Sequence, residues 1–184
     1  MPRSPRNALP LDSARLEEIA LAYVARYATS RAKLEAYLAR KLRERGWAGP
    51  GEAKLEAISG RFAEAGYIDD AAFARARTGS LLRRGYGPRR VGQALAAAGI
   101  GEELREELRP GEAELRAAAL ALARRRGFGP FGASSPDQAL RQKQLAAMVR
   151  AGHSFDLSRT LVDAPDVASV ELWVDEAGGD SPCD

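Results

Sequence analysis

Cysteine and histidine are nearly missing from this sequence of 184 residues, which contains only Cys183 and His153. One cysteine cannot form a disulfide within the chain, and the two residues together are too few for a zinc site or a histidine-based catalytic triad. The sequence also lacks the phosphate-binding motif Gly-x4-Gly-Lys-Ser/Thr, so we do not expect it to bind ATP. These absences predict a protein that is not an enzyme and that uses no metal or cofactor.

Long apolar runs are absent as well. No stretch of about 18 apolar residues occurs, and the N-terminus has no apolar segment of the signal-peptide type. We therefore expect a cytoplasmic protein without a membrane partner. Aromatic residues make up only 7% of the sequence, and β-branched residues form no alternating run of strand length before residue 164. Because alanine, leucine, arginine and glutamate all favour helices, the composition predicts an all-α fold.

Basic residues are in excess once the C-terminal tail is set aside. The net charge of the chain is +3, but residues 164–184 contain no basic residue and six acidic ones: Asp166, Glu171, Asp175, Glu176, Asp180 and Asp184. Residues 1–163 therefore contain 28 basic and 19 acidic residues, a net charge of +9. Such a surplus favours a polyanionic or acidic partner. We expect the tail to be disordered, although "VASVELWV" within it also fits a short strand or helix.

A repeated helix ending organises the chain. Two apolar residues spaced four apart, then a glycine four positions later, occur at Leu38-Leu42-Gly46, Ile58-Phe62-Gly66 and Val91-Leu95-Gly99. The glycines at positions 46, 99 and 152 are 53 residues apart each time, a period that suggests stacked helical units. The pattern predicts nine short helices in three tandem three-helix repeats, at residues 12–47, 48–100 and 101–163. A disordered segment is expected at residues 1–11.

Arginines gather at two similar helix joints, "LLRRGYGPRR" at residues 81–90 and "RRRGFGP" at residues 124–130. The candidates for a partner-binding surface are Arg83, Arg84, Arg89, Arg90, Arg124, Arg125 and Arg126. Arginines at the C-terminal end of a helix also stabilise the helix dipole without a partner, which is an alternative interpretation of Arg83 and Arg84. Arg89 and Arg90 lie in the first turn of a helix, where cations are unfavourable. We therefore favour contact with phosphate or carboxylate groups for these two.

Two further features have both a structural and a functional interpretation. Asp69 and Asp70 precede a helix, and we favour capping of its free N–H groups over acid–base catalysis or contact with a basic partner. Tyr86 and Phe128 lie at the two arginine-rich joints. We expect both rings to pack inward rather than to stack on nucleic-acid bases.

The run "RFAEAGYIDDAAFARARTGSLLRRGYGPRRVGQALAAAGI" at residues 61–100 resembles the signature of the RecX family of recombination regulators. The residues that carry the resemblance are Gly66, Tyr67, Ile68, Asp69, Asp70, Phe73, Ala74, Gly85, Tyr86, Gly87, Pro88, Arg90, Leu95, Gly99 and Ile100. Residues 27–42 are similar to the first-repeat helix of that family, and residues 124–128 to its third repeat. The third repeat departs most from the family pattern, and the acidic tail is not part of that pattern.

The resemblance implies an elongated, curved all-α molecule made of three three-helix repeats. It also implies binding to the recombinase RecA, above all to the RecA–single-stranded-DNA filament, with inhibition of its recombinase, ATPase and coprotease activities. The alternative is a nucleic-acid-binding regulator of the helix-turn-helix type, because short helices joined by glycine turns imitate that motif. We also expect a monomer with weak, non-specific and salt-sensitive DNA binding of its own.

Overall fold

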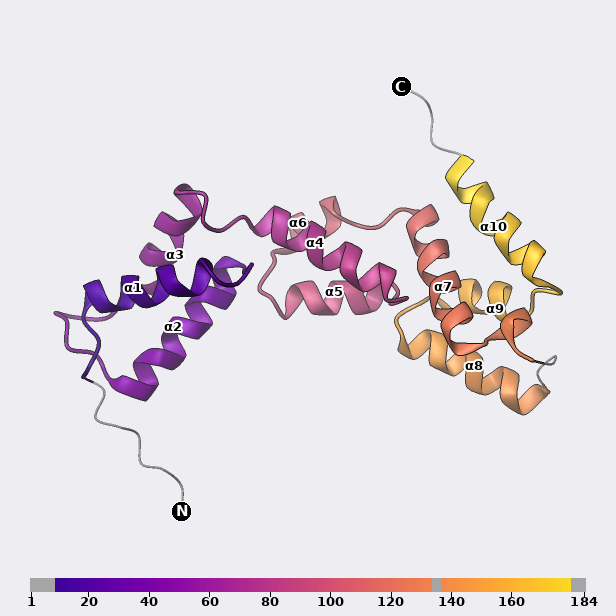
Figure 1. Cartoon of the computed structure of the whole chain (residues 1–184), viewed down its shortest axis with the longest axis horizontal. Coiled ribbons are helices and arrows are strands. Elements are labelled where there is room, and N and C mark those ends of the chain that lie inside the picture. Colours follow the sequence, from indigo (N-terminus) through magenta and orange to yellow (C-terminus); the bar gives the residue numbers. More distant parts are fainter. Residues whose placement is uncertain (1–8, 134–136, 180–184) are drawn as a thin grey trace, which may run out of the picture. The chain divides into compact units, whose positions relative to one another are not determined.

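Figure 1 shows the computed structural model, which describes residues 9–133 and 137–179 of the chain. These residues form ten α-helices and one 3-10 helix, and their one extended pairing is an isolated bridge between Leu11 and Trp47. The all-α prediction is therefore confirmed. None of the described helices is long and apolar enough to cross a membrane. The elements are α1 (Ser13–Val24), α2 (Arg31–Arg45), α3 (Leu55–Glu64), α4 (Asp70–Arg83), α5 (Pro88–Ala96), α6 (Glu102–Glu107), α7 (Glu112–Arg126), η1 (Gly129–Phe131), α8 (Gln138–Arg150), α9 (Phe155–Val162) and α10 (Val167–Gly179).

Side-chain caps and a proline determine where several helices begin. Asp12 accepts a hydrogen bond from the backbone N–H of Arg15 at 2.8 Å, and Ser30 accepts one from that of Lys33 at 3.3 Å. Each bond satisfies a donor that an α-helix leaves free in its first turn. Pro88 is the first residue of α5, a position where the missing N–H removes no helical hydrogen bond.

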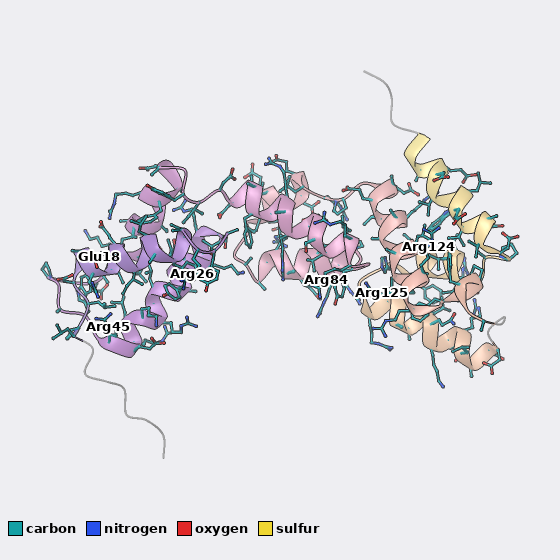
Figure 2. All side chains as sticks on the ribbon, in the orientation of Figure 1. Glu18, Arg26, Arg45, Arg84, Arg124 and Arg125 are labelled. Atoms are coloured by element: carbon teal, nitrogen blue, oxygen red, sulfur yellow. The ribbon has the colours of Figure 1, made fainter. Side chains whose placement is uncertain are left out.

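The chain divides into two compact units, and the first consists of residues up to 73 together with residues 98–100. Its core includes Leu16, Leu34, Leu38 and Ile58, on α1, α2 and α3. Leu11 is fully buried in this core, and its N–H donates to the carbonyl of Gly46 at 2.9 Å. Arg45, labelled in Figure 2, donates to the carbonyl of Leu9 at 2.8 Å. The expectation of disorder over residues 1–11 is therefore wrong for Leu9 and Leu11, while residues 1–8 lie outside the described residues.

The second unit consists of residues 74–97 and the residues from 101 onwards. Its core contains Leu122, Leu145, Met148, Leu161 and Val170, which come from α7, α8, α9 and α10. Phe128 packs against this core, as expected. The core therefore joins the last predicted repeat to the tail that follows it.

The tail corrects the expectation of disorder, because residues 167–179 form α10. Asp166 accepts hydrogen bonds from the N–H and the hydroxyl of Ser169, both at 2.8 Å, and these bonds lower the pKa of the Asp166 carboxyl. Val170 is only 1% exposed, and Trp173, three positions later, packs against the same core. An apolar face at helical spacing thus outweighs the acidic composition that suggested disorder. Residues 180–184 lie outside the described residues.

Candidate partner interface

The first half of the family-like motif, residues 66–73, holds the N-terminus of α2. Asp69 caps α4, because its carboxylate accepts the backbone N–H of Ala72 at 2.8 Å. The carboxylate of Asp70 instead accepts the N–H of Arg31, in the first turn of α2, at 2.9 Å. The expectation that both aspartates cap the same helix is therefore right for Asp69 and wrong for Asp70, which satisfies a free donor of another helix.

Other residues of the motif lie around the same helix start. Ser30 donates its hydroxyl to the carbonyl of Ala98 at 2.5 Å. A Cβ atom on Gly99, whose φ is +73°, would overlap the Cβ of Ala32. The ammonium group of Lys33 lies over the ring of Phe73, 5.1 Å from the ring centroid. Through these contacts the motif residues stabilise the packing around the start of α2 in the first unit.

Gly66 and Tyr67 mark the end of α3. Gly66 has a φ of +77° and donates its N–H to the carbonyl of Ala63 at 2.9 Å. Tyr67 remains 59% exposed, with its ring tilted against that of Phe62 at a centroid distance of 5.6 Å. Both residues end a helix, as the sequence predicted.

The second half of the motif, residues 85–88, docks on α7 and on the joint between α8 and α9. The N–H of Gly87 donates to the carbonyl of Ala151 at 2.9 Å. A Cβ atom on Gly85 would lie 2.9 Å from the backbone nitrogen of Leu122, and one on Gly87 would overlap the backbone of Gly152. Backbone segments approach this closely only where side chains are missing. The joint is therefore a packed junction rather than a free loop.

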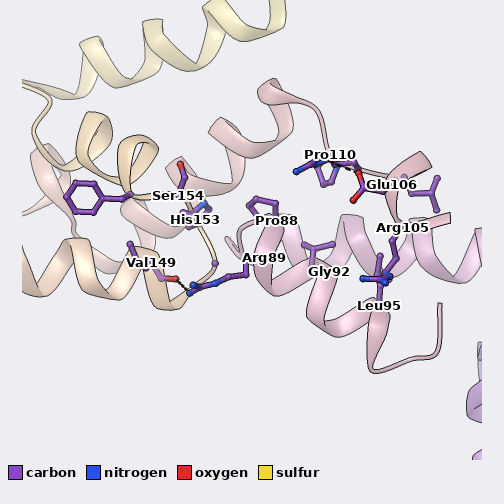
Figure 3. Close-up of a pocket in the computed structure, with 15 residues that line it drawn as sticks. Pro88, Arg89, Gly92, Leu95, Arg105, Glu106, Pro110, Val149, His153 and Ser154 are labelled. Carbon is purple, nitrogen blue, oxygen red and sulfur yellow. Dashed lines mark hydrogen bonds and ion pairs between the residues drawn. The ribbon is translucent and has the colours of Figure 1, made fainter. Parts of the chain in front are cut away.

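His153 joins the same junction from the α8–α9 side (Figure 3). The side chain is buried, and its Nε2 lies 3.0 Å from the carbonyl oxygen of Gly85. Because a carbonyl only accepts hydrogen bonds, Nε2 carries the proton, and the buried Nδ1 has no partner among the described residues. Burial lowers the pKa of the imidazole from its ordinary value near 6.5.

Acidification should therefore destabilise this junction. Below about pH 6.5 the unfolded chain binds a proton on His153, whereas the folded chain resists protonation down to its lower pKa. The free energy of unfolding should be fully retained above about pH 6.5 and should fall below it, by at most about 1.4 kcal/mol per pH unit. Thermal melting between pH 5 and pH 8 checks this, with His153→Gln expected to lose that part of the pH dependence. Identical profiles for the two proteins would contradict the assignment to His153.

Arg89 has a hydrogen-bond partner inside the chain. Its Nη2 donates to the carbonyl of Val149 at 2.6 Å (Figure 3), and its backbone N–H donates to that of Gly152 at 3.2 Å. Val149 lies in the last turn of α8, where the helix dipole favours a cation. The C-terminal end of α8 therefore accounts for a cation at this position without an external partner, and contact of Arg89 with a partner stays a prediction.

Arg124, at the end of α7, is also engaged within the chain. Its guanidinium forms an ion pair with Glu171 of α10 and lies 5.8 Å from the ring centroid of Phe131. Arg125 and Arg126 are exposed, and neither forms an ion pair with another residue that the structure describes. Arg124 therefore differs from its two neighbours in having a partner within the chain, and contact of the three arginines with a protein or DNA partner stays a prediction.

Two arginines of the first joint, Arg84 and Arg90, border a groove of about 360 Å³ between α4 and α5, here called the basic groove. The guanidinium of Arg84, labelled in Figure 2, lies over the half-buried ring of Tyr86, 5.3 Å from its centroid. Within the described part of the chain, the groove is lined by three arginines and no acidic residue: Arg77, Leu81, Arg84, Tyr86, Arg90, Gln93, Ala94 and Ala97. Such a lining favours an anionic partner.

Arg77 and Gln93 are residues of this groove that the sequence analysis missed. Arg77 precedes Arg84 by seven positions, or two helical turns, and Gln93 follows Arg90 by three. Residues at these spacings share one helical face, so helical periodicity could have identified Arg77 and Gln93 from the sequence. Arg83 is exposed but does not line the groove.

A second groove, of about 490 Å³, is lined by the other face of α5, by α6 and by the α8–α9 joint (Figure 3). Its lining mixes apolar residues such as Leu95 with charged ones. Arg89 there is already bonded to Val149, and Arg109 forms an ion pair with Glu106 at 3.3 Å. The basic groove is therefore the stronger candidate for an anionic partner.

Comparisons with known proteins support the family resemblance that the motif suggested. A family model described as "RecX, second three-helix domain" matches residues 69–108, which contain α4, α5 and α6. A protein of Thermus thermophilus named "Regulatory protein RecX" is 43% identical over 107 residues, which cover 58% of this chain and 68% of that protein. A protein of the same name from Halorhodospira halophila is 34% identical over 155 residues, covering 82% and 88% respectively. The chain belongs to the RecX family.

The RecX fold is supported over most of the chain. The crystal structure of RecX from Lactobacillus salivarius aligns with a TM-score of 0.63 at 17% identity, covering 86% of this chain and 96% of that one. That likeness supports the helical repeat fold alone. The RecX domain matched by the family model begins at residue 69, whereas the glycine spacing placed the second repeat at residues 48–100. The repeat boundaries therefore stay a prediction.

Proposed function

We propose that this RecX-family chain regulates DNA repair and recombination by binding RecA and the RecA–single-stranded-DNA filament. On binding, it inhibits the recombinase, ATPase and coprotease activities of RecA. The observation that carries the proposal is the basic groove, which lies within the matched three-helix domain and contains Tyr86 and Arg90 of the family-like motif. The relatives named above are called regulatory proteins, which agrees with a role that needs no catalytic site.

The chemistry of the groove fits such a partner. A nucleoprotein filament presents phosphate oxygens, and protein surfaces present carboxylates. The planar guanidinium group binds either one through paired hydrogen bonds. The groove borders the packed junction at residues 85–88, and Arg84 rests on Tyr86. The guanidinium of Arg84 is therefore positioned before binding, which lowers the entropic cost of association.

The purified chain should suppress the DNA-stimulated ATP hydrolysis of RecA from the same organism, increasingly as its concentration approaches that of RecA. Blocking the filament removes the assembly that hydrolyses ATP, so the rate per RecA should fall. A coupled ATPase assay with single-stranded DNA measures it. An unchanged rate at equimolar chain, together with tight sequence-specific binding to duplex DNA, would instead favour the helix-turn-helix alternative.

A further inference from the structure

Three tyrosines gather on the surface of the first unit, and none of them belongs to the family-like motif at residues 61–100. Tyr23 of α1 stacks on Tyr37 of α2, with ring centroids 4.1 Å apart and planes 17° apart. Tyr27 leans against Tyr23 at a centroid distance of 5.3 Å. Tyr23 and Tyr37 pack against the core of the unit, but Tyr27 is 52% exposed and is not part of that cluster. Core packing thus accounts for two of the tyrosines and not for Tyr27.

Cations border this row of rings. A groove of about 530 Å³ is lined by the three tyrosines together with Ala22, Arg26, Arg40 and Lys41. Its volume falls within the range of roughly 300–1,000 Å³ that is typical of ligand sites. Arg40 and Lys41 lie over the ring of Tyr37, 5.3 and 5.8 Å from its centroid.

The charge of this surface remains positive after its internal ion pairs are counted. Glu44 is 2.7 Å from Lys41 and 3.7 Å from Arg40, so one carboxylate serves two cations. Arg26, labelled in Figure 2, follows α1 and forms no ion pair with another described residue. An anionic ligand would therefore find at least two uncompensated cations beside an open aromatic ring.

We propose that this surface, the tyrosine platform formed by Tyr23, Tyr27, Tyr37, Arg26, Arg40 and Lys41, binds single-stranded DNA. An unpaired base stacks on the open face of Tyr27 and extends the row of rings, while flanking phosphates contact Arg26 on one side and Arg40 on the other. Exposed aromatic rings beside a basic groove are the combination that binds single strands without regard to sequence.

The same features argue against other occupants. The bases of a duplex are already stacked on each other and offer no face to Tyr27. The described lining contains no Ser, Thr, Asn or Gln, and its tyrosines and cations suit the bases and phosphates that DNA and RNA share, so the groove has no feature that favours RNA. An acidic protein segment would satisfy the cations but would leave the ring of Tyr27 unused.

Fluorescence anisotropy with a labelled oligothymidylate, in the absence of RecA, tests the platform on the full chain. Tyr27→Ala should weaken binding by about fivefold or more, the effect of losing one stacked base, while Tyr27→Phe should bind like the wild type. Arg26→Gln should reduce the slope of log affinity against log salt by about 0.7, as expected for one lost phosphate contact. Tyr67→Ala removes an equally exposed tyrosine elsewhere in the same unit and should change nothing.

Wild-type affinity in Tyr27→Ala, or a loss in Tyr27→Phe as large as in Tyr27→Ala, would overturn the stacking role. Duplex DNA bound as tightly as the single strand, or oligouridylate bound more tightly than oligothymidylate, would overturn the choice of ligand. Displacement of the oligonucleotide by polyglutamate, with no effect of Tyr27→Ala, would indicate an acidic protein segment instead. Because RecA is not present, failure here is separate from failure of the ATPase test above.

Discussion

Gly87→Ala should lower the free energy of unfolding by about 3 kcal/mol, the upper end of what forced overpacking costs. Gly87 has a φ of −83°, so alanine meets no backbone strain there. The penalty is purely steric, because the new Cβ would overlap the backbone of Gly152 and His153. Relief requires the two joints to separate, which breaks the hydrogen bond from Gly87 to the carbonyl of Ala151.

Gly92→Ala is the matched control for this prediction. Gly92 lies within α5, five residues from Gly87, and a Cβ atom there would meet nothing within 4 Å. Alanine at such a helical position should raise stability by about 0.5–1 kcal/mol. Urea unfolding of the two variants should therefore give changes of opposite sign. Equal stability of Gly87→Ala and the wild type would contradict the packed junction.

The double variant Arg84→Glu/Arg90→Glu should weaken binding to RecA–single-stranded-DNA filaments by about 10- to 100-fold, corresponding to about 1.4–2.7 kcal/mol. It reverses two of the three cations of the basic groove and leaves Arg89, which bonds to α8, in place. The fold should tolerate the change, because both side chains are exposed and the two dipole effects oppose each other: a glutamate suits the first turn of α5, whereas one just after the end of α4 is unfavourable.

Arg75→Glu/Lys143→Glu provides the control for charge alone. Both residues are exposed, neither lines the basic groove, and the change in net charge is the same. Co-sedimentation of each protein with RecA filaments at fixed ionic strength gives the comparison. A control that binds as poorly as the groove variant would mean that overall charge, and not the groove, governs binding.

The sequence predicted the helices and their junctions well because their determinants are local. Caps such as Ser30, the proline that opens α5 and the helix-ending glycine at position 66 act within a few residues of themselves. The family resemblance rested on residues of this kind, and the comparisons confirmed it.

The hydrogen-bond and ion-pair partners of individual side chains could not be predicted from the sequence in the same way. Asp70 bonds to a helix start 39 residues away, and Arg89 bonds to a helix end 60 residues away. Arg124 pairs with Glu171 across 47 residues, in a tail whose acidic composition suggested disorder. Each of these partners depends on tertiary packing, so the sequence marked the arginines as a group without separating those used internally from those that face the groove.

The most direct test of the regulatory role is the inhibition of RecA ATPase activity by three proteins in parallel: the wild type, Arg84→Glu/Arg90→Glu and Arg75→Glu/Lys143→Glu. If the basic groove contacts the filament, the wild type and the control Arg75→Glu/Lys143→Glu should inhibit at the same midpoint concentration. The groove variant should then require at least about tenfold more protein, as its weaker binding implies. Coincident inhibition curves for all three proteins, or no inhibition by the wild type, would contradict the proposal that the basic groove contacts the RecA filament and inhibits it.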